Sequence, residues 1–78
     1  MSAAQATVGA APVTIRLNGK SREVRDGHTV RSLLEELELH PGMVVVELNR
    51  EILERDRYAD VAVRAGDSIE LVHFVGGG

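Results

Sequence analysis

The last four residues, Val75-Gly76-Gly77-Gly78, carry the most distinctive chemistry in the sequence. Three glycines have no Cβ, so their backbone can adopt dihedral angles closed to other residues and can pass through a narrow slot. In an extended form they carry the carboxylate of Gly78 about 10 Å beyond the preceding residues. We therefore expect a flexible tail, Gly76 to Gly78, that enters the active site of another protein. The alternative is that these glycines only fray, as chain ends often do.

Other residues that could bind a metal or a phosphate lack a suitable arrangement. His28, His40 and His73 are scattered, and the chain contains no cysteine, so we expect no metal site. The stretch Asn18-Gly19-Lys20-Ser21 is similar to the end of a phosphate-binding loop, but the earlier glycine of that motif is missing and no helix is expected to follow. We interpret it as a hairpin turn.

Acid–base and nucleophilic catalysis have equally little support. Glu35, Glu36 and Glu38 are expected on the solvated face of a helix, where nothing excludes water or shifts a pKa. No serine is expected to have a histidine base nearby, and a small aliphatic core leaves no room for a substrate cavity. We predict no catalytic residue and no bound cofactor. The chain is not expected to be an enzyme.

Length, charge and composition predict one small domain that binds other proteins. The 78 residues are 44% hydrophobic, carry a formal net charge of -3 and include only two aromatic residues, Tyr58 and Phe74. A nucleic-acid surface needs a clustered basic patch, which is absent from the sequence. No apolar run is long enough to span a membrane, and no signal-peptide pattern is present. We expect a cytoplasmic protein with no membrane or nucleic-acid partner.

The first half of the chain predicts a leader, a β-hairpin and a helix. Residues 1–12 have too little apolar bulk to offset the entropy of ordering, and we interpret them as a disordered leader. Residues 13–17 alternate apolar and polar, Asn18-Gly19 favours a tight turn, and residues 21–25 return. Thr29 stands at a helix N-cap position. The apolar stripe of this helix comprises Val30, Leu33, Leu34 and Leu37.

The second half predicts two strands around an irregular segment. Residues 43–48 form a β-branched run, Asn49-Arg50 makes a turn, and residues 51–53 are a short extended piece. One helical turn is possible over residues 54–58, Val61 and Val63 alternate again, and residues 68–75 form the last strand. One amphipathic helix can cover one sheet face. We predict an α+β fold over residues 13–75, in which one mixed sheet packs on one main helix.

The parity of the last strand decides which of its side chains face solvent. Glu70 cannot be buried without a partner, so Ile69 and Leu71 are assigned to the helix side. Val72 and Phe74 then lie on the open side of the sheet, directly before the glycines. They are either covered by the irregular segment or, as we expect, form a docking patch that guides the tail into a partner.

With this element order and the glycine terminus, residues 13–78 resemble the ThiS-type ubiquitin-like sulfur carriers of the ThiS/MoaD superfamily, which have the β-grasp fold. The resemblance lies in a set of short motifs taken in order: Leu17-Asn18-Gly19-Lys20, Thr29-Val30, Leu33-Leu34, Val46 to Ile52, Gly66-Asp67-Ser68-Ile69, and His73 to Gly78. Glu54 departs from the pattern, since such carriers often have a proline before Arg55.

The resemblance implies a function in thiamine biosynthesis. A ThiF-like adenylating enzyme would use ATP and Mg²⁺ to convert the carboxylate of Gly78 into an acyl-adenylate. A cysteine desulfurase system would supply the sulfur of a thiocarboxylate at Gly78, and a ThiG-like thiazole synthase would take that sulfur. Gly76 and Gly77 would occupy a tunnel, with Val72, Phe74 and Val75 binding the partner.

Three other interpretations remain open at this point. The small subunit of molybdopterin synthase, a MoaD-like carrier, has the same fold and the same terminal chemistry but another acceptor. A ubiquitin-like protein modifier would form isopeptide bonds, or would carry sulfur for another product. A plain β-grasp interaction module would make no use of its glycines.

Overall fold

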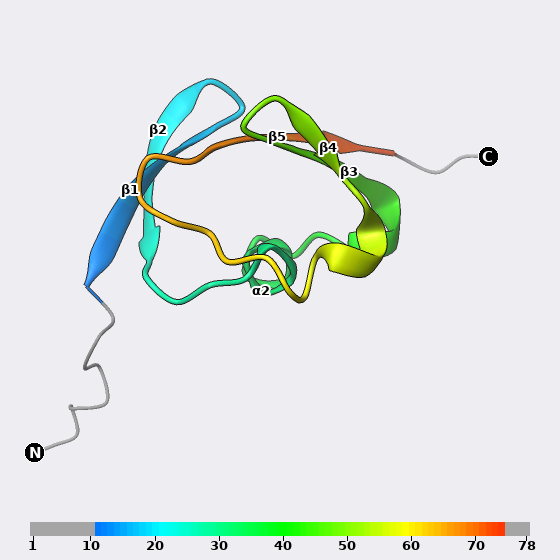
Figure 1. Ribbon diagram of the computed structural model, residues 1–78, viewed down its shortest axis with the longest axis horizontal. Helices are drawn as coiled ribbons and strands as arrows, with labels where there is room; N and C mark the ends of the chain where they lie inside the picture. The colour runs from blue at the N-terminus through cyan, green and yellow to red at the C-terminus, as the bar shows by residue number, and fades with distance from the viewer. Residues whose placement is uncertain (1–10, 75–78) are drawn as a thin grey trace, which may run out of the picture.

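The computed structural model describes residues 11–74 and consists of a five-stranded sheet covered on one face by a helix (Figure 1). Its elements are β1 (Pro12–Leu17), β2 (Lys20–Arg25), α2 (Val30–Glu36), the 3₁₀ turn η1 (Pro41–Met43), β3 (Val44–Leu48), β4 (Glu51–Leu53), the 3₁₀ turn η2 (Arg55–Arg57) and β5 (Ser68–His73). The strand order is β2-β1-β5-β3-β4. Because β1 pairs with β5 in parallel while the other pairs are antiparallel, the predicted mixed sheet and α+β class are confirmed.

Both strand pairs at the sheet edges are joined by two-residue turns with positive φ angles. Asn18 and Gly19 have φ values of 51° and 83°, and Asn49 and Arg50 have values of 51° and 73°. Consecutive positive φ angles match the twist of an antiparallel hairpin, and asparagine and glycine tolerate them best. The two predicted turns are therefore confirmed, although the second places an arginine where glycine would be less strained.

Helix α2 begins where the sequence indicates but ends early. The Thr29 side chain accepts a hydrogen bond from the Ser32 amide, and the Ser32 side chain accepts one from the Thr29 amide, which forms a capping box. Arg31 and Glu35 pair across one turn of the helix, with Nε and Oε2 3.1 Å apart. The helix stops at Glu36, and Glu38 already has a φ of 62°. The helix therefore ends just before Leu37, the last residue of the predicted apolar stripe.

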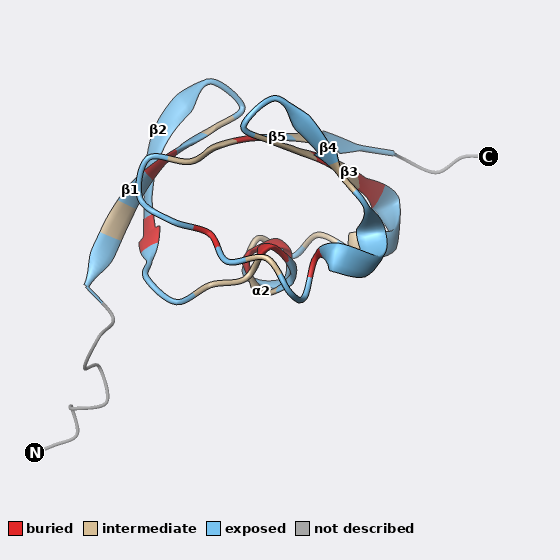
Figure 2. Cartoon of the chain, viewed as in Figure 1, coloured by how far each residue is buried: buried red, intermediate tan, exposed pale blue. Residues whose placement is uncertain are grey.

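The core lies between α2 and the inner face of the sheet (Figure 2). Its buried hydrophobic residues are Ile15, Val24, Val30, Leu33, Leu34, Val44, Val46, Tyr58, Val63 and Ile69. Tyr58, which the sequence placed in a charged segment, is 3% exposed. Its hydroxyl donates to the Val44 carbonyl oxygen at 3.0 Å, so the polar end of the ring is satisfied inside the core.

Several element boundaries differ from prediction by a residue. Strand β1 starts at Pro12 rather than at residue 13, and Met43 belongs to η1 rather than to β3. The alternation of Val61 and Val63 does not make a strand, since Ala62 forms a single bridge to Thr29. Pro12, the last residue of the predicted leader, thus already belongs to the sheet. The states expected for residues 1–10 and 75–78 stay predictions, because those residues lie outside the described part. Within residues 11–74 no helix has the length and apolarity needed to cross a bilayer.

Candidate functional site: the end of β5 and the outer sheet face

The described chain reaches Phe74, one residue short of the predicted partner-binding Val75 and the tail of Gly76, Gly77 and Gly78. Those four residues lie outside the described part, so their roles stay predictions. Phe74 itself is held in place, because its amide donates to the Met43 carbonyl oxygen at 2.9 Å. This bond extends the β3–β5 pairing, in which Val44 lies opposite His73 and Val45 opposite Val72. The fold therefore fixes where the tail begins.

The predicted parity of β5 is confirmed. Ile69 is 1% exposed and packs in the core, whereas Glu70 is exposed. Val72 and Phe74 are 56% and 51% exposed on the opposite face. The irregular segment does not cover them, since it lies on the helix side of the sheet (Figure 1). Two apolar side chains thus stand in solvent immediately before the tail.

These two residues are part of a larger apolar surface that the sequence analysis did not identify. We call it the outer patch and define it as Val45, Ile52, Val72 and Phe74. Val45 lies opposite Val72 on β3, and Ile52, which is 66% exposed, lies on β4. The strand register could not be inferred from the sequence, although Ile52 was identifiable as the apolar centre of a short strand.

Two carboxylates lie at the centre of this surface. Glu47 on β3 is directly opposite Glu70 on β5, and Ile52 is the neighbour of Glu47 on β4. Opposed like charges weaken a sheet slightly. Among residues 11–74 the ion pairs are His28–Glu36 and Arg31–Glu35, so neither carboxylate has a basic partner there. Over β3, β4 and β5 the outer face therefore combines an apolar patch with two adjacent carboxylates.

A serine with a histidine neighbour occurs at the start of α2, contrary to the sequence analysis. His28 Nδ1 lies 2.7 Å from Ser32 Oγ, and His28 Nε2 lies 2.9 Å from Glu36 Oε1. The second contact is poorly directed, because Nε2 is a buried atom without a hydrogen bond. Ser32 Oγ also contacts the amide and the carbonyl of Thr29. The hydroxyl is therefore occupied in the helix cap, which favours a structural function over nucleophilic attack.

A surface hollow of about 400 Å³ lies between the first turn of α2, η1 and η2. Its lining comprises Arg31, His40, Pro41, Gly42, Arg55, Asp56, Tyr58 and Ala59. The sequence analysis expected no cavity in the core, and this hollow lies at the surface rather than in the core. No signal in the sequence indicated it, because its residues are brought together from three separate segments. Within the described residues, no group of three potential ligands is placed to hold a metal ion.

The match to a family model decides which family this chain represents. Residues 15–78 match the model of the ThiS family, so the match includes the outer patch and the glycine terminus. The chain belongs to the ThiS family. The resemblance inferred from the sequence motifs is confirmed.

Individual relatives agree with this assignment. The sulfur carrier protein ThiS of Bacillus subtilis is 43% identical over 65 residues, covering 82% of this chain and 98% of that protein. A thiazole synthase of Paramagnetospirillum magneticum is 45% identical over 62 residues, which cover 80% of this chain but 19% of that longer protein. A segment similar to this ThiS-family chain is thus one part of a longer protein that is named for thiazole synthesis.

A solved structure supports the fold as well as the family. The crystal structure of the thiamine biosynthesis protein ThiS from Geobacter metallireducens has a TM-score of 0.70 and 38% identity to this chain. The match covers 85% of this chain and all of that one. The predicted β-grasp arrangement is therefore confirmed.

Proposed function

We propose that this ThiS-family chain is a sulfur carrier protein of thiamine biosynthesis and that Gly78 is the residue that carries the sulfur. A carboxylate is a poor electrophile until one of its oxygens becomes part of a good leaving group. Adenylation by a ThiF-like enzyme with ATP and Mg²⁺ releases pyrophosphate and makes AMP that leaving group. A persulfide sulfur then attacks the carbonyl and displaces AMP, and a thiol reductant cleaves the resulting acyl disulfide to leave the thiocarboxylate. The chain acts as a covalent substrate and a donor rather than as an enzyme.

The observation that best supports this proposal is the outer patch at the start of the tail. Val72 and Phe74 are more than half exposed, whereas Ile69 and Leu71 on the other face of β5 are buried and partly buried. Large apolar side chains that stay in solvent beside one another mark a surface for protein binding. The hydrogen bond from the Phe74 amide to the Met43 carbonyl oxygen fixes the backbone at the end of the described chain. A partner that binds the patch therefore also receives the following glycines in a defined direction.

The sulfur acceptor that we propose is a ThiG-like thiazole synthase. Support comes from the thiazole synthases that include a segment similar to this chain, since two functions joined in one protein are often partners when separate. These relatives carry thiamine-related names, so they favour this acceptor over that of a molybdopterin synthase small subunit or a protein modifier. A cysteine desulfurase system completes the proposed set of partners, and we place the reaction in the cytoplasm.

The proposal is tested by the intact mass of the chain after incubation with a ThiF-like enzyme, ATP, Mg²⁺, cysteine, a cysteine desulfurase and a thiol reductant. We expect the mass gained when one oxygen is exchanged for one sulfur, localised by fragmentation to Gly78. A variant without Gly77 and Gly78 and one extended by an alanine after Gly78 serve as controls, and both should stay unchanged. An unchanged mass for the full chain, with an enzyme that loads its own carrier, contradicts the proposal.

A further inference from the structure

The hollow between α2, η1 and η2 presents hydrogen-bond donors that the structure positions but does not use. Arg55 Nε donates to the Pro41 carbonyl oxygen at 3.3 Å, which directs the guanidinium over η1. Arg31 is oriented by its contact with Glu35, and its side chain is 58% exposed. Each contact uses one guanidinium nitrogen, so within residues 11–74 the two terminal nitrogens of each arginine remain available as donors.

His40 adds a third donor of fixed orientation. Its Nδ1 accepts a hydrogen bond from the Gly42 amide at 2.9 Å. Because Nδ1 is the acceptor, the proton of the neutral ring lies on Nε2, the nitrogen on the other side of the ring. The hollow has one acidic residue, Asp56, and in the described residues no ion pair joins it to Arg31 or Arg55. The lining is thus rich in donors and favours an anion.

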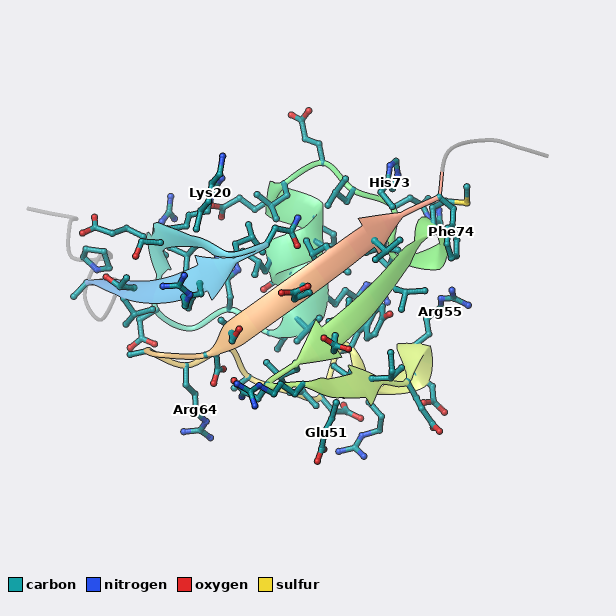
Figure 3. All side chains as sticks on the ribbon, turned by 90° about the horizontal axis from the view of Figure 1, so that it is seen from above. Lys20, Glu51, Arg55, Arg64, His73 and Phe74 are labelled. Atoms are coloured by element: carbon teal, nitrogen blue, oxygen red, sulfur yellow. The ribbon has the colours of Figure 1, made fainter. Side chains whose placement is uncertain are left out.

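The hollow lies at the end of the molecule from which the tail departs. Figure 3 shows Arg55 and Phe74 at the same end of the sheet. Turn η1 connects the two sites directly, because the Pro41 carbonyl accepts from Arg55 and the Met43 carbonyl accepts from Phe74. In Figure 1 the turns η1 and η2 and the end of β5 lie together, on the side opposite the β1–β2 hairpin.

We infer that this hollow binds an acidic side chain of the protein that receives the tail. The inference rests on the proposed function, since it assumes that a partner takes the tail. The outer patch lies on one face of the sheet, whereas the hollow lies in the helix layer. If the partner contacts the outer patch alone, the domain can still rotate relative to the partner. A second contact, at the hollow in the helix layer, prevents that rotation. Two exposed guanidiniums suit a carboxylate, which they bind in a planar, bidentate geometry.

Charge reversal at Arg55, with a matched control two residues away, tests the inference. Arg55→Glu and Arg57→Glu change the net charge equally, and both positions are exposed, but Arg57 does not line the hollow. The Kd of each variant is measured with the ThiF-like enzyme and with the thiazole synthase. We expect Arg55→Glu to bind at least one partner about tenfold more weakly, with a difference that shrinks at high salt. Arg57→Glu should bind as the unchanged chain does.

Two further measurements make the outcome specific. Arg55→Lys should lose less affinity than Arg55→Glu, since the charge remains while the planar donor pair is lost. At saturating ThiF-like enzyme, Arg55→Glu should still gain sulfur at Gly78. Failure of the unchanged chain to gain sulfur would count against the proposed function, whereas equal affinities of all three variants for both partners would overturn this inference alone.

A small anion is the alternative occupant of the hollow, and inorganic phosphate serves as its probe. If phosphate titration gives saturable binding that Arg55→Glu abolishes, while partner affinities stay unchanged, the hollow takes a free anion and the inference is wrong. Weak or absent phosphate binding together with a loss of partner affinity supports the inference. Thermal unfolding is measured for each variant, and an unchanged Tm shows that the substitution leaves the fold intact.

Discussion

The two faces of the sheet contain similar aliphatic side chains but have opposite surroundings. On the inner face, Val44, Val46 and Ile69 are at most 1% exposed, because α2 and the segment around Tyr58 cover them. On the outer face, Ile52 and Val72 are more than half exposed. Figure 2 shows both conditions along the single strand β5. The burial of these residues therefore depends on the side of the sheet on which they lie, not on their type.

Because of this difference, neighbouring residues of one strand can serve different purposes: one stabilises the fold and the next binds a partner. Strand period two places adjacent residues on opposite faces, so β5 contributes Ile69 to the core and Val72 to the outer patch. A carrier needs an apolar surface that binds partners and a core that stays buried. Alternation along β5 provides the two together, and it places the exposed apolar residues next to the tail.

The largest expected effect is the loss of stability on truncating the inner face. Ile69→Ala removes a side chain that is 1% exposed, and such changes reduce the free energy of unfolding by about 2–5 kcal/mol. Val72→Ala, three positions along the same strand, should change it by less than about 0.5 kcal/mol. Urea denaturation of the two variants measures both values. Equal losses would show that the outer face is covered in solution, and sedimentation would then test for self-association.

A change on the outer face should instead affect partner binding. Phe74→Asp places a charge in the outer patch, where Phe74 is 51% exposed, and should weaken binding of the ThiF-like enzyme about tenfold or more. The urea midpoint should stay close to that of the unchanged chain. Competition against the unchanged chain in the sulfur-loading assay measures the affinity. Unfolding of this variant would contradict the assignment of Phe74 to the outer face.

The inner face could be predicted from the sequence because local patterns determine it. Period-two alternation identified Ile15 and Val24, the helical stripe identified Leu33 and Leu34, and the charge of Glu70 fixed the parity of β5. Asn18-Gly19 marked the first turn, and Asn49 marked the second. Each of these inferences depends on residues within a few positions of one another.

The rest depends on contacts between distant segments, which a single sequence does not specify. The pairing of β3 with β5 places Val45 beside Val72, and no local pattern encodes that register. The hollow combines His40 with Arg55, whose Nε donates to the Pro41 carbonyl oxygen. The burial of Tyr58 was not predicted, because its neighbours in the sequence are charged and its hydrogen-bond partner, the Val44 carbonyl oxygen, lies on a distant strand.

The smallest expected effect concerns the carboxylates at the centre of the outer face. Glu70→Gln removes the repulsion from Glu47 across the β3–β5 pair and should raise the free energy of unfolding by about 0.2–1 kcal/mol. Glu23→Gln is the matched control, since Glu23 lies opposite the uncharged Thr14 on β1 and β2, and it should have a smaller effect. Urea denaturation at low and high salt distinguishes the two, because screening weakens the repulsion.

A gain for Glu70→Gln that disappears in salt means that the chain keeps a locally unfavourable charge pair on its outer face. The physical benefit of that pair is that opposed carboxylates oppose the stacking of two apolar outer patches against each other. The same variant should then self-associate at concentrations where the unchanged chain is monomeric, which light scattering detects. Equal responses of Glu70→Gln and Glu23→Gln would show instead that only net charge matters, and that the two faces differ in apolar burial alone.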